Sequence, residues 1–231
     1  MIFRQLFERE SSTYTYLIGC EHSQQAVLID TVKSEVPKYL QLLQELGLKL
    51  AYALDTHTHA DHITGAGALR DATGCTTLLG EEAGSSCVSQ GLQDGDVISI
   101  GQLQLKAIYT PGHTDDSYSY LLDDAGQTYL FSGDTLLIRG TGRTDFQNGN
   151  ARDQYHSLFN KLLALPDQTL VYPGHDYKGW TLSSIGEEKA HNPRLQAKDI
   201  NAYVELMSNL KLPNPQMMDI AVPANRACGK D

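Results

Sequence analysis

The sequence predicts a mixed α/β protein, and three observations support this class. Short apolar runs of strand length alternate with segments whose apolar residues recur every three to four positions, as in helices. Turn signals rich in glycine, proline and aspartate separate these runs. Four of the runs end directly in histidine or aspartate. A chain of 231 residues can bury a large core, so we expect one domain over residues 1–231, with a short C-terminal extension from about residue 192.

The first half of the chain opens as a strand meander and then alternates strand and helix. A helix follows the meander, with Ser34 as the expected cap and Gly47 as its end. A second helix ends at Gly74, and residues 81–91 are weakly patterned, as in a short helix or a loop. The expected strands cover residues 14–19, 26–30, 50–55 and 75–79, and the expected helices residues 34–46 and 65–73.

The second half is predicted to be richer in strands. A hairpin is expected around Gly101, and the turn signal at residues 123–126 joins two further strands. An amphipathic helix then leads to a last strand. The expected strands cover residues 97–100, 103–109, 118–122, 128–131 and 169–172, and the expected helix covers residues 150–164.

Composition excludes several classes of function. Eighteen Lys and Arg residues against 28 Asp and Glu give a net charge of −10, which argues against a nucleic-acid or anionic-membrane surface. No apolar stretch has signal-peptide or transmembrane length, so we expect a cytoplasmic protein. The cysteines lie far apart without a C-x-x-C pair, which indicates neither a disulfide framework nor a zinc ribbon. We expect them to be mostly small buried residues and Cys228 to be inert; they are Cys20, Cys75, Cys87 and Cys228.

The strongest motif is the run Thr-His-Thr-His-Ala-Asp-His at residues 56–62, directly after an apolar strand. One-residue spacing along an extended backbone points His57 and His59 the same way. Imidazole nitrogen and carboxylate oxygen together suit zinc or iron. A histidine-rich surface loop or a tag fragment is the alternative, but a tag would be terminal and monotonous.

Three later strands also end in ligand-type residues. Pro-Gly precedes both His113 and His175, and Ser-Gly precedes Asp134. Each string by itself is ordinary turn chemistry. Strands hold geometry while the loops at their ends carry chemistry, so the repetition predicts one metal site built from groups spread over more than 100 residues.

These residues resemble the metallo-β-lactamase superfamily, whose His-x-His-x-Asp-His motif is matched at residues 57–62. The later ligands of the superfamily match His113, Asp134 and His175. The resemblance implies a four-layer αββα sandwich with the site along one sheet edge.

Within the superfamily, several strings look like the persulfide dioxygenase branch. They lie at residues 55–65, 137–147, 175–179, 192–195, 212–215 and 221–225. Glyoxalase II is the competing branch, but the tail lacks the longer Lys/Arg-bearing C-terminal domain of those relatives. The sequence departs from the branch pattern at Thr58, where some relatives carry Cys, and at Asp115 and Asp116, where a turn with glycine is expected.

The resemblance implies a mononuclear enzyme in which His57, His113 and Asp134 bind one Fe(II) per chain, leaving open coordination positions. It would oxidise glutathione persulfide with O2 and water to sulfite and glutathione, a step of sulfide detoxification. The alternative is a dinuclear hydrolase of S-lactoylglutathione. The remaining motif residues are His59, Asp61, His62 and His175. They would bind a second metal in that hydrolase, whereas in the dioxygenase they would orient ligands and water. Asp61, His62 and His175 are also the expected catalytic groups.

Four residues are expected to contact the substrate. Arg143 could clamp a glutathione carboxylate or pair with Asp145 to hold its loop. Tyr177 matches a glutathione-contacting tyrosine of the superfamily, Thr114 is expected to hydrogen-bond near the metal, and Arg226 is a weaker candidate. By resemblance we also expect a homodimer or homotetramer and a rhodanese-type sulfurtransferase partner.

Overall fold

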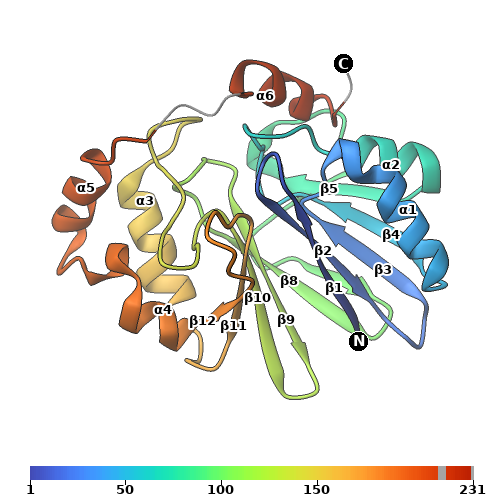
Figure 1. Ribbon diagram of the computed structural model, residues 1–231, viewed down its shortest axis with the longest axis horizontal. Helices are drawn as coiled ribbons and strands as arrows, with labels where there is room; N and C mark the ends of the chain where they lie inside the picture. Colours follow the sequence, from blue (N-terminus) through green and yellow to red (C-terminus); the bar gives the residue numbers. More distant parts are fainter. Residues whose placement is uncertain (213–216, 230–231) are drawn as a thin grey trace.

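The computed structural model describes residues 1–212 and 217–229. Two six-stranded sheets face each other, and helices cover the outer face of each sheet (Figure 1). This arrangement confirms the α/β class and the four-layer sandwich. Pro213 and Pro215 of the tail string lie outside the described residues. Within the described ranges, no helix is long and apolar enough to cross a membrane.

The first sheet has the strand order β1-β2-β3-β4-β5-β6. Strands β1 to β3 are antiparallel, and β3 to β6 are parallel. β1 was not predicted from the sequence; it is a half-buried edge strand that pairs with β2 from Ile2 opposite Gly19 to Glu8 opposite Thr13. The strands are β1 (Ile2–Glu8), β2 (Thr13–Gly19), β3 (Gln25–Ile29), β4 (Lys49–Leu54), β5 (Thr76–Gly80) and β6 (Gln90–Leu92).

The second sheet has the order β12-β11-β10-β9-β8-β7. Strands β7 to β10 form an antiparallel meander, and β10 pairs with β11 in parallel, so the chain crosses over between them through a helix. The strands are β7 (Val97–Ile100), β8 (Leu103–Tyr109), β9 (Tyr118–Asp124), β10 (Gln127–Gly133), β11 (Leu170–Pro173) and β12 (Ser183–Ser184).

The helices lie on the two outer faces. In Figure 1, α1 and α2 cover the first sheet, α3, α4 and α5 cover the second, and α6 lies across the top. Their bounds are α1 (Val36–Glu45), α2 (Ala66–Thr73), α3 (Ala151–His156), α4 (Ile185–His191), α5 (Ile200–Ser208) and α6 (Met218–Arg226). Three short 3₁₀ turns are η1 (Lys33–Glu35), η2 (Glu81–Ala83) and η4 (Pro193–Gln196), and the π-helical turn η3 (Ser157–Leu162) extends α3.

The start of α1 differs from the prediction. Ser34 lies inside η1, and α1 begins after Glu35 without a side-chain cap. Pro37 lies in its first turn, where a proline's fixed backbone angle suits a helix and its missing N–H needs no partner. Gly47 and Gly74 end α1 and α2 as predicted, with φ of 63° and 72°, the left-handed region that glycine adopts without strain.

Three apolar clusters hold the layers together. Successive side chains of a strand point to opposite faces, so Tyr16 and Ile18 pack between the sheets while Leu17 packs under α1 and α2. The layer between the sheets also buries Tyr120 and Phe131. A third cluster joins the second sheet to α3, α4 and α5. The two sheets are therefore a rigid base for the loops at their ends.

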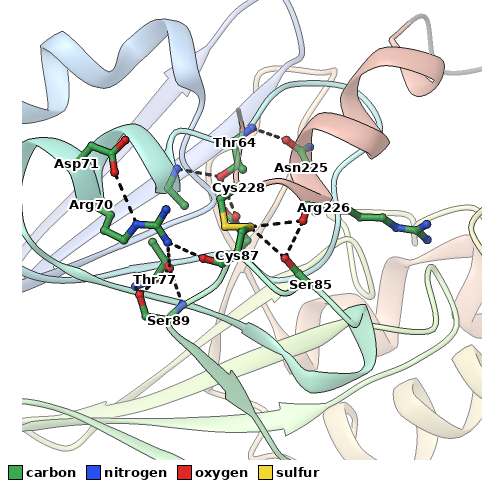
Figure 2. Close-up of a disulfide and its surroundings, with 12 residues drawn as sticks. Thr64, Arg70, Asp71, Thr77, Ser85, Cys87, Ser89, Asn225, Arg226 and Cys228 are labelled. Atoms are coloured by element: carbon green, nitrogen blue, oxygen red, sulfur yellow. Dashed lines mark hydrogen bonds and ion pairs between the residues drawn. A yellow bond between two sulfur atoms is a disulfide. The ribbon is translucent and has the colours of Figure 1, made fainter. Parts of the chain in front are cut away.

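Two of the four cysteines depart from the prediction. Cys87 and Cys228 form a disulfide, with Cα atoms 5.9 Å apart and a sequence separation of 141 (Figure 2). Only the tertiary fold brings the two together, so no local spacing signals the pair. Cys20 and Cys75 are buried free thiols, as predicted.

Candidate metal centre

The four groups of ligand-type residues meet at one edge of the sandwich. Residues 57–62 follow β4 of the first sheet, whereas His113, Asp134 and His175 follow β8, β10 and β11 of the second. Since the strands are packed into the core, their ends hold the loops in place. The structure therefore brings together all seven residues of the predicted site.

One cluster contains His57, His113 and Asp134, whose ligand atoms all lie within 4.8 Å of one another. His113 Nδ1 donates to the carbonyl of Arg143 at 2.8 Å. His57 Nδ1 lies 2.9 Å from the hydroxyl oxygen of Thr56, and that hydroxyl donates to Asp30 at 3.0 Å, so its oxygen accepts from the imidazole. Both imidazoles are thereby held with the Nε2 lone pair free, the form that binds a metal ion.

A second cluster contains His59, Asp61 and His62, again within 4.8 Å. His59 Nε2 lies 3.1 Å from Asp30, and His62 Nδ1 lies 2.8 Å from Asp61. The other nitrogens, His59 Nδ1 and His62 Nε2, are buried and have no hydrogen-bond partner among the described residues. Buried polar atoms rarely lack a partner, so these two nitrogens also fit a bound cation.

His175 joins the two clusters. Its Nδ1 lies 2.6 Å from Asp134 Oδ1, and its Nε2 lies 2.9 Å from Asp61 Oδ2. Burial opposes a charge on His175, but the two carboxylates outweigh it and raise the pKa of the imidazole well above its usual value. Burial would raise the pKa of Asp61, yet His175 and His62 hold it well below the usual range. Without metal, His175 acts as a charged bridge between the carboxylates.

A cavity of about 1000 Å³ opens over the centre, with Asp61, His62, His113, Asp134 and His175 in its lining. Residues from both sheets and from the C-terminal part of the chain form its walls. The centre thus lies at the wall of a cavity large enough for a peptide-sized ligand.

Two of the four predicted substrate contacts line this cavity. Tyr177 is 72 % exposed and stacks on His175, with the ring planes 3° from parallel. Arg143 makes a bidentate ion pair with Asp145, in which Nε donates to Oδ1 at 2.7 Å and Nη2 donates to Oδ2 at 2.8 Å. Its guanidinium also lies over the ring of Phe146. The loop-holding alternative for Arg143 is therefore present in the structure, at the cavity wall.

The structure does not bring the other two predicted contacts to the cavity. Thr114 is buried and donates to Asp116 at 2.5 Å. Arg226 borders a separate polar pocket of about 40 Å³ together with Thr58 and Asp116. Neither Thr114 nor Arg226 is among the described residues that line the large cavity.

Arg194 lines the cavity and was missed as a contact. Its Nη1 donates to the carbonyl of Thr141 and, at 3.0 Å, to the Thr141 hydroxyl. Among the described residues, it makes no ion pair, and burial lowers the pKa of its guanidinium. The signal in the sequence was the string at residues 192–195, which matched the branch pattern but suggested no role for the arginine.

Comparisons with known proteins agree with this geometry. The sequence model of the metallo-beta-lactamase superfamily matches residues 9–175. The mitochondrial persulfide dioxygenase ETHE1 of Homo sapiens is 46 % identical over 99 % of this chain and 89 % of its own length. The crystal structure of ETHE1 from Myxococcus xanthus is 56 % identical and covers both chains completely, with a TM-score of 0.96.

A hydroxyacylglutathione hydrolase of a Polaromonas species is more distant, at 38 % identity over 71 % of this chain and 62 % of its own length. The persulfide dioxygenases are therefore more similar than this hydrolase in both identity and coverage. The chain belongs to the metallo-beta-lactamase superfamily and, within it, to the enzyme family of the persulfide dioxygenases.

Proposed function

We propose that this protein oxidises glutathione persulfide with O2 and water to sulfite and glutathione, using one Fe(II) held by His57, His113 and Asp134. The observation that carries the proposal is the geometry of these three residues. Two imidazoles with free Nε2 atoms and one carboxylate converge within 4.8 Å. Two histidines and one carboxylate are the ligand set of non-haem iron oxygenases. Iron in such a site would supply the redox chemistry with oxygen.

The chain's own residues would position the substrate and move protons. His175 lies between Asp134 and Asp61, at 2.6 and 2.9 Å, so it could orient Asp134 and pass a proton to Asp61. Asp61 and His62 line the cavity and would hold the water that the reaction consumes. Tyr177, stacked on His175, would cover the thiol end of the substrate.

The cavity wall suits an anionic peptide thiol although the chain as a whole is acidic. Lys33, Arg139, Arg143, Lys178 and Arg194 all line the cavity. Arg139 is paired with Glu187 and Glu188, and Arg143 with Asp145. Arg194 is the guanidinium best placed to take a carboxylate of glutathione, because it has no carboxylate partner among the described residues.

A second candidate function is the dinuclear hydrolysis of S-lactoylglutathione. His59 Nδ1 and His62 Nε2, which have no hydrogen-bond partner among the described residues, favour it, since both would suit a second metal ion. The smaller similarity to the hydroxyacylglutathione hydrolase ranks it below the dioxygenase. Metal identity belongs to the proposal as well, because affinity order alone would favour zinc over iron.

The test is oxygen consumption by anaerobically purified protein on addition of glutathione persulfide, with metal counted on the same sample. We expect rapid oxygen loss with sulfite formation at one iron per chain. His113→Ala should abolish both iron binding and oxygen uptake. His156→Ala is the matched control, because His156 lies exposed on α3 away from the cavity, and it should behave like the wild type.

Three outcomes together would refute the dioxygenase and establish the second candidate. They are no oxygen uptake, two zinc-like metal ions per chain and hydrolysis of S-lactoylglutathione.

A homodimer or homotetramer, a rhodanese-type sulfurtransferase partner and a cytoplasmic location also remain part of the proposal. Light scattering on the purified protein would test the oligomeric state.

A further inference from the structure

The C-terminal helix α6 contacts residues 59–64, the segment that follows the proposed iron ligand His57, through the buried side chain of Asn225. The side-chain amide of Asn225 donates to the carbonyls of His59 and His62, at 2.9 and 2.8 Å. Its oxygen accepts from the backbone N–H of Thr64 at 2.8 Å (Figure 2). Asn225 is only 5 % exposed, so water does not substitute for these bonds.

These three bonds need the chemistry of an amide. Asparagine offers two N–H donors and an oxygen acceptor in one planar group. An aspartate would keep the acceptor for Thr64 but would place an oxygen against the carbonyls of His59 and His62. Buried backbone groups that lose their partners raise the free energy of the folded state. The conformation of segment 59–64 therefore depends on Asn225.

The disulfide lies three residues beyond Asn225. It joins Cys228 to Cys87, which lies in the loop between η2 and β6 (Figure 2). The hydroxyl of Ser85 in the same loop donates to the carbonyl of Arg226 at 2.9 Å. A Cβ atom at Gly67 would meet the Cys228 carbonyl at 2.2 Å, so Cys228 packs tightly against α2.

We propose that Asn225 is a positioning residue for segment 59–64, which follows the proposed iron ligand His57, and that the Cys87–Cys228 disulfide is the tether that keeps Asn225 in place. Asn225 acts through the backbone of His59 and His62. Reduction of this disulfide breaks the S–S bond and takes up two electrons and two protons. An added dithiol supplies the electrons and the protons as it is oxidised to its own disulfide, which leaves Cys87 and Cys228 as thiols. The inference rests on the proposed function only for the choice of Fe(II) as the metal whose affinity is measured.

The first experiment compares Asn225→Asp with Asn209→Asp in the full chain. Asn209 is exposed at the end of α5, and among the described residues its side chain bonds only to the carbonyl of Glu205. Segment 59–64 reaches the proposed iron ligand Asp134 through Asp61 and His175. For Asn225→Asp we therefore expect Fe(II) affinity, measured against a competing chelator, to fall about tenfold, the lower end of the effect of removing a group that orients metal ligands. Hydrogen exchange of the Thr64 amide in the metal-free protein should become about tenfold faster, because the carbonyls of His59 and His62 repel the new carboxylate and move it away from the Thr64 N–H, and one hydrogen bond contributes about that factor. Asn209→Asp should match the wild type.

The second experiment opens the tether while leaving Asn225 intact. Alkylation of the denatured wild type should detect two thiols before treatment with dithiothreitol and four after it. Reduction of the wild type should accelerate amide hydrogen exchange within residues 57–64 to the rate seen in the Cys87→Ser variant. The same treatment should leave exchange in Cys87→Ser unchanged, because that variant has no tether to open.

Each part of the inference has a result that overturns it. Wild-type exchange and metal affinity in Asn225→Asp would exclude the positioning role, and four thiols before reduction would exclude the tether. If Asn225→Asp does not fold, hydrogen exchange in the Cys87→Ser variant decides the question. The inference is wrong if exchange in that variant is the same as in the wild type, or if it is faster by the same factor across the whole chain. A wild type without oxygen uptake would refute the proposed function, while metal affinity and exchange would still decide this inference.

Discussion

At the scale of single residues, a buried carboxylate links the two loops that carry His57 and His113. Asp116 Oδ2 accepts from the backbone N–H of Thr58 at 3.0 Å and from its hydroxyl at 2.5 Å. Asp116 Oδ1 accepts from the Thr114 hydroxyl at 2.5 Å. Thr58 and Asp116 are two positions at which the sequence departs from its branch pattern. Because they bond to each other, the two departures form one structural feature.

Asp116→Asn should therefore loosen the metal centre. The amide group has one oxygen in place of two, so it cannot accept from both Thr58 and Thr114. We expect Fe(II) affinity to fall about 10-fold or more, the usual effect of removing a group that orients metal ligands. A titration against a competing chelator measures it.

Asp115→Asn is the matched control, because Asp115 is exposed and, within the described part of the chain, its carboxylate accepts only from Asn148, at 2.8 Å. This variant should bind metal like the wild type. Equal affinities for Asp116→Asn and Asp115→Asn would show that Asp116 has no part in positioning the ligands.

At the scale of elements, the helix α3 packs against the turn that carries His113. Gly112 precedes this histidine with a φ of +139°, and a Cβ atom there would lie 2.3 Å from Gln154 Cα. The N–H of Asn150, which caps α3, donates to the Gly112 carbonyl at 2.8 Å. The close approach of helix and turn therefore requires glycine.

Gly112→Ala should destabilise the protein by at least about 2 kcal/mol, because it adds a steric clash to the backbone strain of a residue with this φ. Urea unfolding of the metal-free protein measures the change. Gly126→Ala is the control, since Gly126 has a φ of +83° but open space where its Cβ would lie. That variant carries the backbone strain alone, so its free energy of unfolding should fall by less. If both variants lose the same free energy of unfolding, the contact with α3 contributes nothing to stability.

At the scale of the whole molecule, the metal centre connects the two sheets. The segment that carries His57 follows β4 of the first sheet, whereas His113 and Asp134 follow strands of the second. An ion bound by all three residues binds only when the sheets are packed together. Binding to the folded state alone shifts the folding equilibrium by mass action.

Metal removal should therefore lower the unfolding free energy of the whole protein. At a free Fe(II) concentration 100 times the dissociation constant, the bound ion adds about 2.7 kcal/mol. Anaerobic thermal unfolding with and without a chelator should show a higher Tm for the loaded wild type. His113→Ala should show no such shift. A shift of equal size in His113→Ala would place the stabilising ion somewhere else.

The sequence by itself determined the mixed α/β class, most of the strands and the seven ligand-type residues. Short apolar runs and turn signals are local properties, so β2, β3 and the hairpin of β7 and β8 could be predicted from the sequence directly. The edge strand β1 could not, because it is only half-buried and its apolar pattern is weak. Resemblance to a family supplied the layered architecture and the choice of reaction.

Only the tertiary structure decided which distant groups meet. The Cys87–Cys228 disulfide, the contacts of Asn225 with segment 59–64, and the place of Arg194 at the cavity all join residues far apart in sequence. It also separated Tyr177 and Arg143, which line the cavity, from Thr114 and Arg226, which do not. The physical reason is that local patterns set the conformation of each segment, whereas the packing of two sheets and their helices sets the distances between side chains.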